Sequence, residues 1–158
     1  ELISRYTNEE IKIKWPNDLF INDRKAGGIL IENVIQGQLW QWCIIGIGIN
    51  IIQDKFQENI ERATSLKQTT GKSYNPVNLA KELHSIVLSK IAELQEGRYK
   101  KMLTEYNTRL FGRHKRVKLK KGSIVFETLI EEVSPSGELI TNGAIGQAFK
   151  FDEVEWIF

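Results

Sequence analysis

The sequence predicts an α+β fold in which a mostly antiparallel sheet with helices is followed by a small β-barrel. Three observations support this prediction. Apolar segments separated by turn residues over 11–49 are typical of neighbouring strands, and a long apolar stripe after residue 75 is typical of a helix. Short β-type segments separated by glycines fill the chain after residue 112. We expect two domains, residues 1–110 and 111–158.

The first part of the chain is expected to form a sheet. Residues 1–10 carry apolar side chains at helical spacing and are expected to form the end of a helix. Apolar and charged residues alternate over 11–15, which is typical of a half-buried strand, and Pro16 ends it because proline cannot donate to a sheet ladder. Asn22-Asp23 and Gln36-Gly37 are turn candidates. The expected strands around these turns, in meander order with the last covered on both faces, are 18–21, 25–35 and 38–49.

Two helices are expected next. Residues 51–75 are expected to be a loop with a short helix near 55–62. Asn75 can cap a helix through its side chain, and the proline after it fits a first helical turn, so the best predicted helix begins there. Gly97 ends it, and a second helix is expected over 98–110. The apolar stripe of the first helix consists of Leu79, Leu83, Ile86, Val87, Ile91 and Leu94.

The character of the chain changes around residue 111. Short β-type segments separated by glycines follow, and several short strands in so few residues are typical of a small barrel. The expected strands are 115–120, 123–132, 137–142, 145–150 and 154–157.

The composition indicates a folded protein and excludes several classes. Of the 158 residues, 41% are apolar and 27% are charged, and the net charge of +2 is too small to indicate nucleic-acid binding by itself. Cys43 is the only cysteine and lies in an apolar run, so we expect a buried thiol and no disulfide. His84 and His114 are too far apart for a recognisable zinc-ligand spacing. No signal peptide and no membrane-spanning run is found, so we expect a cytoplasmic protein without a membrane partner.

One segment groups side chains that can bind anions. Within KWPNDLFINDRKAGGILIE, residues 14–32, a hairpin can bring Lys14, Asn17, Asp18 and Lys25 to one rim. Lysines donate to carboxylate or phosphate oxygens, asparagine can donate and accept, and an aspartate can accept a proton or fix a lysine. The glycines at 27 and 28 allow a ligand or another strand to approach the backbone. The composition of these residues, taken by itself, favours a surface hairpin with solvated charges.

A second segment, Gly46-Ile47-Gly48-Ile49-Asn50, ends the predicted strand 38–49. Glycines at alternate positions open one face of a sheet. It is a weak nucleotide signature, because the third glycine of a dinucleotide fingerprint is missing and no helix follows. Asn50 could contact the edge of a base, or the segment could be a packing glycine pair with a turn asparagine.

Together the two segments resemble the biotin–protein ligase family. That family has a KWPND motif, a lysine seven residues after the aspartate, and a GxGIN strand end about thirty residues beyond the motif. Lys14–Asp18, Lys25, Gly28 and Gly46–Asn50 match in order and spacing. The resemblance continues through Ala63-Thr64-Ser65-Leu66 and the helix pair into the C-terminal segment. Lipoate ligases share the fold and the lysine, but we do not expect the WPND form in them.

The resemblance implies a fold and a reaction. The fold would be the C-terminal part of a catalytic domain similar to that of class II aminoacyl-tRNA synthetases, followed by an SH3-like β-barrel. The reaction would be ATP-dependent biotinylation: the family makes biotinyl-5′-AMP from biotin and ATP with Mg²⁺, and transfers biotin to one lysine of a biotin carboxyl carrier protein. We therefore expect a ligase with biotin, ATP and Mg²⁺ as its ligands.

The resemblance also implies roles for single residues. Lys25 matches the lysine that contacts the biotin carboxylate and the adenylate, where its ammonium would offset charge on the attacked phosphate. Asp18 would orient the acceptor lysine or help to remove its proton. Asn17 and Asn50 match positions near the ligand, with Asn50 facing adenine. Gly28 would give the ligand room, and Lys14 would belong to the same binding site.

The chain also departs from the family pattern. The family's glycine- and arginine-rich loop, which closes over biotin and the phosphates, precedes KWPND, whereas only thirteen residues precede Lys14 here. The helix-turn-helix domain of some members is also absent. We therefore expect that this chain alone is inactive, or that the missing N-terminal half of the enzyme is supplied as another chain. The family can dimerise through its central sheet, so a homodimer is a further possible partner.

An alternative function rests on the basic segment Arg113–Lys121. Its cations could contact nucleic acid or an acidic protein face, which would make the chain a non-catalytic binding module. However, Val117 and Leu119 alternate with the cations and are expected to point inward. A solvated edge strand protected by lysines is the commoner explanation of such a pattern, so we do not expect nucleic-acid binding. A contact with ATP or with the carrier domain is a third interpretation.

Overall fold

The computed structural model describes residues 1–158 except 38, 58–61, 96, 144 and 146–147. The chain forms two compact units. The first comprises Glu1–Lys12 and Asn17–Ala92, and the second comprises Ile13–Pro16 and Glu93–Phe158. The predicted domain boundary near residue 111 lies inside the second unit and stays a prediction.

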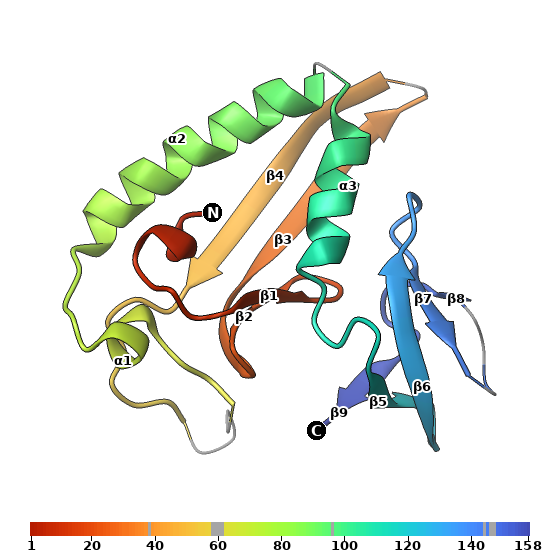
Figure 1. The fold of residues 1–158 in the computed structure, drawn as a ribbon. Helices are drawn as coiled ribbons and strands as arrows, with labels where there is room; N and C mark the ends of the chain where they lie inside the picture. Colours follow the sequence, from red (N-terminus) through yellow and green to blue (C-terminus); the bar gives the residue numbers. More distant parts are fainter. Residues whose placement is uncertain (38, 58–61, 96, 144, 146–147) are drawn as a thin grey trace. The chain divides into compact units, whose positions relative to one another are not determined.

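The expected antiparallel meander forms in the first unit. The sheet has the strand order β1-β2-β3-β4, with β1 at Ile11–Lys14, β2 at Asp18–Ile21, β3 at Arg24–Gln36 and β4 at Leu39–Ile49. β3 pairs antiparallel with both β2 and β4. Asn22 takes the left-handed conformation (φ 55°) in the β2–β3 turn, where asparagine is one of the few side chains tolerated. Figure 1 shows β3 and β4 as a long hairpin with α2 running along it.

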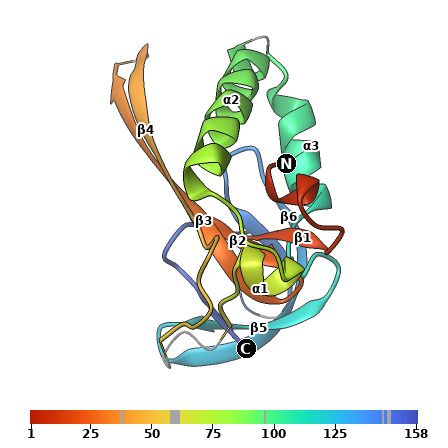
Figure 2. The same ribbon diagram turned by 90° about the vertical axis from the view of Figure 1, so that its left-hand side faces the viewer.

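The expectation that this last strand is covered on both faces is wrong. Trp40, Trp42 and Ile44 of β4 are 57%, 55% and 53% exposed. The physical reason is that the helices of this unit cover only one face of the hairpin, and its tip extends away from α2 (Figure 2). Cys43 is accordingly half-buried rather than buried.

The helices of the first unit agree in part with the sequence prediction. α2 spans Pro76–Gln95, and Asn75 Oδ1 accepts hydrogen bonds from the N–H groups of Val77 and Asn78, as a cap should. Residues 1–10 contain only a short 3₁₀ helix, Ile3–Arg5, instead of the end of an α-helix. A short helix, α1 at Leu66–Thr70, was not predicted; Ser65 caps it by accepting from the Gln68 N–H. The helix expected near 55–62 falls largely on 58–61, outside the described residues.

The second unit holds a helix and a five-stranded sheet. α3 spans Tyr99–Thr108. The strand order is β8-β7-β6-β5-β9, and all the described pairings are antiparallel. Four of the five short strands expected here are confirmed. The fifth, expected over 145–150, is a strand at Ala148–Phe149, and its expected range includes 146–147, which lie outside the described residues. The SH3-like barrel stays a prediction. β5 lies between β6 and β9, so it is not the edge strand that was expected. The strands are β5 Arg116–Lys121, β6 Ile124–Val133, β7 Leu139–Asn142, β8 Ala148–Phe149 and β9 Glu155–Ile157.

Each unit has its own apolar core, as burial of apolar area requires. The core of the first unit joins the N-terminal turn, β2, β3 and α2: Leu2, Ile3, Ile21, Ala26, Ile51, Leu66 and Leu79. The core of the second unit joins its strands to the turn before β5 and to one residue of the KWPND motif: Trp15, Leu110, Leu119, Phe126, Ile130, Val133, Leu139, Phe149 and Val154.

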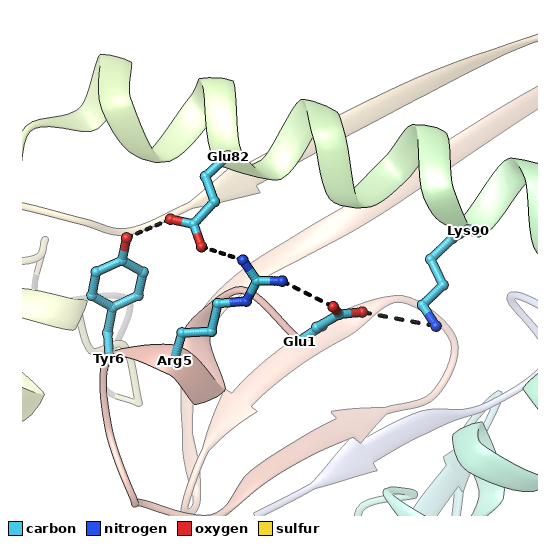
Figure 3. Close-up of polar contacts among 5 residues, drawn as sticks. All are labelled: Glu1, Arg5, Tyr6, Glu82 and Lys90. Atoms are coloured by element: carbon cyan, nitrogen blue, oxygen red, sulfur yellow. Dashed lines mark hydrogen bonds and ion pairs between the residues drawn. The ribbon is translucent and has the colours of Figure 1, made fainter.

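Hydrogen bonds and ion pairs hold the N-terminal turn on α2 in the first unit. Arg5 Nη1 donates to Glu82 Oε1 at 2.6 Å, and the Tyr6 hydroxyl donates to the other oxygen of Glu82 at 2.5 Å. Arg5 also pairs with Glu1 at 3.1 Å, and Glu1 lies 3.8 Å from the Lys90 ammonium (Figure 3). The hydrogen bonds from Tyr6 and Arg5 lower the pKa of Glu82, and the bond to Glu82 raises the pKa of Tyr6.

Within the described part of the chain, none of the helices has the length and apolar character needed to span a lipid bilayer.

Candidate functional site

The centre of the candidate site is an ion pair between Lys25 and Asp18. Lys25 Nζ lies 2.5 Å from Asp18 Oδ1, and the two side chains are 46% and 15% exposed. An ammonium beside a mostly buried carboxylate, but itself open to solvent, can exchange this partner for an anionic ligand. The two residues come from different strands: Asp18 begins β2, and Lys25 is the second residue of β3.

A β-bulge explains why these two side chains meet. The register of β2 and β3 shifts between Leu19, which pairs with Gly27, and Phe20, which pairs with Lys25. Without the bulge, Lys25 would lie opposite Ile21, and its side chain would point to the other face of the sheet, because side chains alternate along a strand. The bulge therefore directs Lys25 to the side that carries Asp18, as bulges often do beside functional sites.

Glycines leave the backbone open beside this pair. Gly28 pairs with Asp18 of β2 and with Gly48 of β4. Gly46 lies two residues before Gly48 in β4, on the same face of the sheet. A Cβ at Gly48 would meet no atom within 4 Å, and one at Gly46 only the Leu30 carbonyl at 3.7 Å. This strip of backbone can accommodate a flat or extended ligand, which fits the role expected of Gly28.

Gly27 serves a different purpose from its neighbour. A Cβ at Gly27 would overlap the carbonyl oxygen of Gly48, whereas one at Gly28 would lie 3.4 Å from the Asn17 carbonyl oxygen and 3.6 Å from Asp18 Oδ1. The close approach of β3 to β4 therefore requires glycine at 27. A side chain at 28 would instead press on the motif residues of the candidate site.

Asn17 and Asn50 are held by the same strands. The Asn17 carbonyl accepts a hydrogen bond from the Ile29 N–H at 2.9 Å, which joins the end of the motif to β3. The Asn50 N–H donates to the Ala26 carbonyl at 2.8 Å, and Asn50 Nδ2 donates to the Thr64 carbonyl at 3.0 Å. Asn50 is thus fixed beside the start of β3, with its amide nitrogen directed to the backbone of residue 64.

The segment 63–66, which the sequence marked only as a match to the family, contacts the backbone of Lys25. The Thr64 N–H donates to the Lys25 carbonyl at 2.9 Å, and the Lys25 N–H donates to the Arg62 carbonyl at 2.6 Å. Arg24 Nη2 donates to the Ala63 carbonyl at 2.5 Å. Thr64 is buried. These hydrogen bonds fix the backbone of Lys25 at the start of β3. No sequence pattern pointed to Arg24.

Lys14 has a different environment from the other predicted site residues. It belongs to the second unit, together with Trp15 and Pro16, whereas Asn17 and Asp18 belong to the first. Its ammonium lies 5.9 Å from the centroid of the Trp156 ring and 5.8 Å from that of Phe158, within the range of cation–π attraction.

The basic segment Arg113–Lys121 is partly neutralised by acidic residues. Leu119 is fully buried while Lys118 is exposed, so the predicted alternation is confirmed. Lys120 pairs with Glu155 at 3.6 Å, and Glu127 lies opposite Lys118 in the sheet. This pairing weakens the attraction of the segment for an anionic partner. Among the described residues, no group of three or more His, Cys, Asp or Glu could hold a metal ion.

Comparison with known proteins identifies the chain's relatives. Residues 2–50 match the model of the biotin/lipoate A/B protein ligase family. The bifunctional ligase/repressor BirA of Bacillus spizizenii is 47% identical over 62 residues, which are 37% of this chain and 19% of that protein. The biotin–[acetyl-CoA-carboxylase] ligase of Paracoccus denitrificans is 25% identical over 141 residues, which are 87% of this chain and 59% of that protein.

The fold is also that of a solved ligase. The crystal structure of the biotin protein ligase from Aquifex aeolicus superposes with a TM-score of 0.80 at 23% identity, covering 98% of this chain and 68% of that one. The chain thus spans less than two thirds of the length of the two relatives matched by sequence. The segment matched by the family model contains the KWPND motif, Lys25 and the Gly46–Asn50 strand end. In the segment matched by the family model, in its sequence relatives and in its fold, the chain is thus similar to biotin–protein ligases.

Proposed function

We propose that the chain forms the lysine-bearing wall of a site for biotinyl-5′-adenylate, in an enzyme that attaches biotin to a lysine of a carrier protein. The observation that supports this most directly is the Lys25–Asp18 pair beside the open backbone of Gly28 and Gly48. The A. aeolicus ligase, whose fold the chain shares, has been solved in complex with biotin and ATP.

Each group has a chemical task in this proposal. Attack of the biotin carboxylate on the α-phosphate of ATP would form the mixed anhydride and release pyrophosphate. The Lys25 ammonium would leave Asp18, contact the carboxylate and phosphate oxygens, and offset the charge that develops there. The acceptor lysine of the carrier would then attack the anhydride carbonyl and release AMP. Asp18, freed from Lys25, would orient this lysine or accept its proton.

The remaining ligands and partners follow from the same proposal. Mg²⁺ would be held mainly by the substrate phosphates, as it usually is at ATP sites. Asn50 Oδ1 would face the adenine ring, because Asn50 Nδ2 is already bonded to Thr64. The partner would be a biotin carboxyl carrier protein. Inactivity of the chain alone, a requirement for an N-terminal half and a homodimer stay predictions.

Binding of a non-hydrolysable biotinyl-5′-AMP analogue to residues 1–158, measured by calorimetry, tests the proposal without requiring turnover. Lys25→Gln should weaken binding about tenfold or more, because hydrogen bonds to charged groups contribute about 1.5–3 kcal/mol. Lys12→Gln is the matched control, since Lys12 pairs with Glu10 at 2.9 Å. The corresponding lipoyl-AMP analogue should bind more weakly than the biotinyl compound. Equal affinities of the two lysine variants, or of the two analogues, would overturn the proposal.

A further inference from the structure

The KWPND motif is divided between the two compact units of the chain. Asn17 and Asp18 lie in the first unit, and Lys14, Trp15 and Pro16 lie in the second. The division falls within five consecutive residues, two of which carry the proposed ligand contacts. The backbone immediately before Asn17 therefore belongs to the second unit.

Hydrogen bonds hold the backbone of residues 13–16 within the second unit. The Ile13 N–H donates to the Arg109 carbonyl at 2.8 Å, and the Ile13 carbonyl accepts from the Phe111 N–H at 2.8 Å. This is a short parallel bridge between Ile13 and Leu110. The start of the motif is therefore paired with the turn that follows α3.

Side chains from α3 and β9 then hold the next two carbonyl groups. Trp156 Nε1 donates to the Trp15 carbonyl at 3.0 Å, and the Tyr106 hydroxyl donates to the Pro16 carbonyl at 3.3 Å. Burial raises the pKa of Tyr106 to about 12, so its hydroxyl keeps the proton that it donates.

The side chain of Trp15 is also held within the second unit. It is 3% exposed, lies in the core of the second unit, and its Nε1 donates to the Gly137 carbonyl at 2.9 Å. The Lys14 ammonium lies near the rings of Trp156 and Phe158, and Phe111 packs against both rings with centroids 5.8 and 6.1 Å away. The Lys14 ammonium is thus held near aromatic rings of the second unit, and its role in ligand binding stays a prediction.

We propose that Tyr106 and Trp156 are positioning residues of the adenylate site. They fix the carbonyls of Pro16 and Trp15, and because consecutive Cα atoms are joined by rigid peptide units, they restrict where Asn17 and Asp18 can lie. The proposal rests on the proposed function for its effect on ligand binding. The effect on the backbone at Asn17 is independent of that function.

The experiment uses Tyr106→Phe and Trp156→Phe, which remove one donor each and retain the aromatic ring. Tyr99→Phe and Trp42→Phe are the matched controls, because both of these residues are more than half exposed. The first readout is hydrogen exchange at the Ile29 amide, which donates to the Asn17 carbonyl in the first unit. The second is the affinity for the biotinyl-5′-AMP analogue, and the third is the thermal midpoint of each variant.

We expect each donor-deleting variant to lose protection at Ile29 by about two- to tenfold, the effect of one hydrogen bond, and the double variant to lose more. Affinity for the analogue should fall by a similar factor, while Tyr99→Phe and Trp42→Phe change neither quantity. A role confined to stability of the second unit would lower the thermal midpoint but leave Ile29 unchanged.

Two results would overturn the inference. One is unchanged protection at Ile29 in both donor-deleting variants. The other is reduced protection at Ile29 with unchanged affinity for the analogue. If the unaltered chain does not bind the analogue, the proposed function fails, and the exchange measurement still decides whether Tyr106 and Trp156 position the motif.

Discussion

The ammonium of Lys25 lies 2.5 Å from Asp18 Oδ1, so the lysine that would bind the ligand is already paired with an anion. An anionic ligand must compete with Asp18 for this lysine. Ion pairs at partly exposed sites contribute about 0.2–1 kcal/mol, so this competition is weak and a phosphate can win it. The same exchange would free the Asp18 carboxylate for a second task.

Asp18→Asn should therefore separate binding from transfer. Loss of the competing charge should leave the affinity for the biotinyl-5′-AMP analogue unchanged, or raise it by at most about fivefold. In an enzyme in which an N-terminal half from the family is supplied to the chain, transfer of biotin to a carrier domain, detected with streptavidin, should fall by about 10²- to 10⁴-fold if Asp18 handles the proton of the acceptor lysine. Asp23→Asn, in the β2–β3 turn, is the control. An Asp18→Asn variant that binds the analogue as poorly as Lys25→Gln would refute this division of roles.

The two adjacent glycines of β3 should respond differently to alanine. Gly27→Ala places a methyl group against the Gly48 carbonyl, and overpacking of this kind costs about 1–3 kcal/mol of unfolding free energy. Gly28→Ala makes only contacts of 3.4 and 3.6 Å and should cost less. Urea denaturation followed by circular dichroism measures both variants. Equal loss of stability would show that the close approach of β3 and β4 is not what requires glycine at 27.

Local rules predicted much of the fold. The turn at Asn22-Asp23 and the cap at Asn75 depend on a few neighbouring residues, and both are confirmed. The alternation of Val117 and Leu119 with cations likewise predicts which face of β5 is buried and which is exposed. Such features follow from the backbone and side-chain chemistry of a short segment, which the sequence contains in full.

The geometry of the site depended on relationships that no short segment contains. The β-bulge that turns Lys25 toward Asp18 arises from the pairing of two strands, and the sequence of either strand does not mark it. The support of Lys25 by Thr64 joins residues thirty-nine positions apart. The exposure of β4 was mispredicted because an apolar strand does not specify which elements cover it.

The exposed face of β4 should tolerate polar substitution. Trp42→Thr should change the unfolding free energy by no more than about 0.5 kcal/mol, because the side chain is 55% exposed. Leu66→Ala, at a position 2% exposed in the core of the same unit, should cost about 2–5 kcal/mol. Urea midpoints compare the two variants directly. A cost for Trp42→Thr close to that of Leu66→Ala would mean that this face is covered in solution.

The ion pairs on α2 should make the stability of the first unit depend on pH in a predictable direction. Because Glu82 has a lowered pKa in the folded chain, its contribution is present above the ordinary value of 4.5 and is lost as the pH falls through the folded pKa. Tyr6 has a raised pKa, so its contribution is present below the ordinary value of 10.0 and is lost as the pH rises through the folded pKa. Both contributions are therefore complete only between these two values.

Glu82→Gln should remove this dependence. The difference in urea midpoint between the unaltered chain and Glu82→Gln should be constant from about pH 6 to 9 and should shrink toward zero as the pH falls below the ordinary glutamate range. Glu105→Gln is the control, because Glu105 makes only a long, exposed pair with Lys101 at 3.9 Å among the contacts described. A difference that grows on acidification would mean that Glu82 binds its proton more readily in the folded chain, contrary to the hydrogen bonds that Tyr6 and Arg5 donate to it.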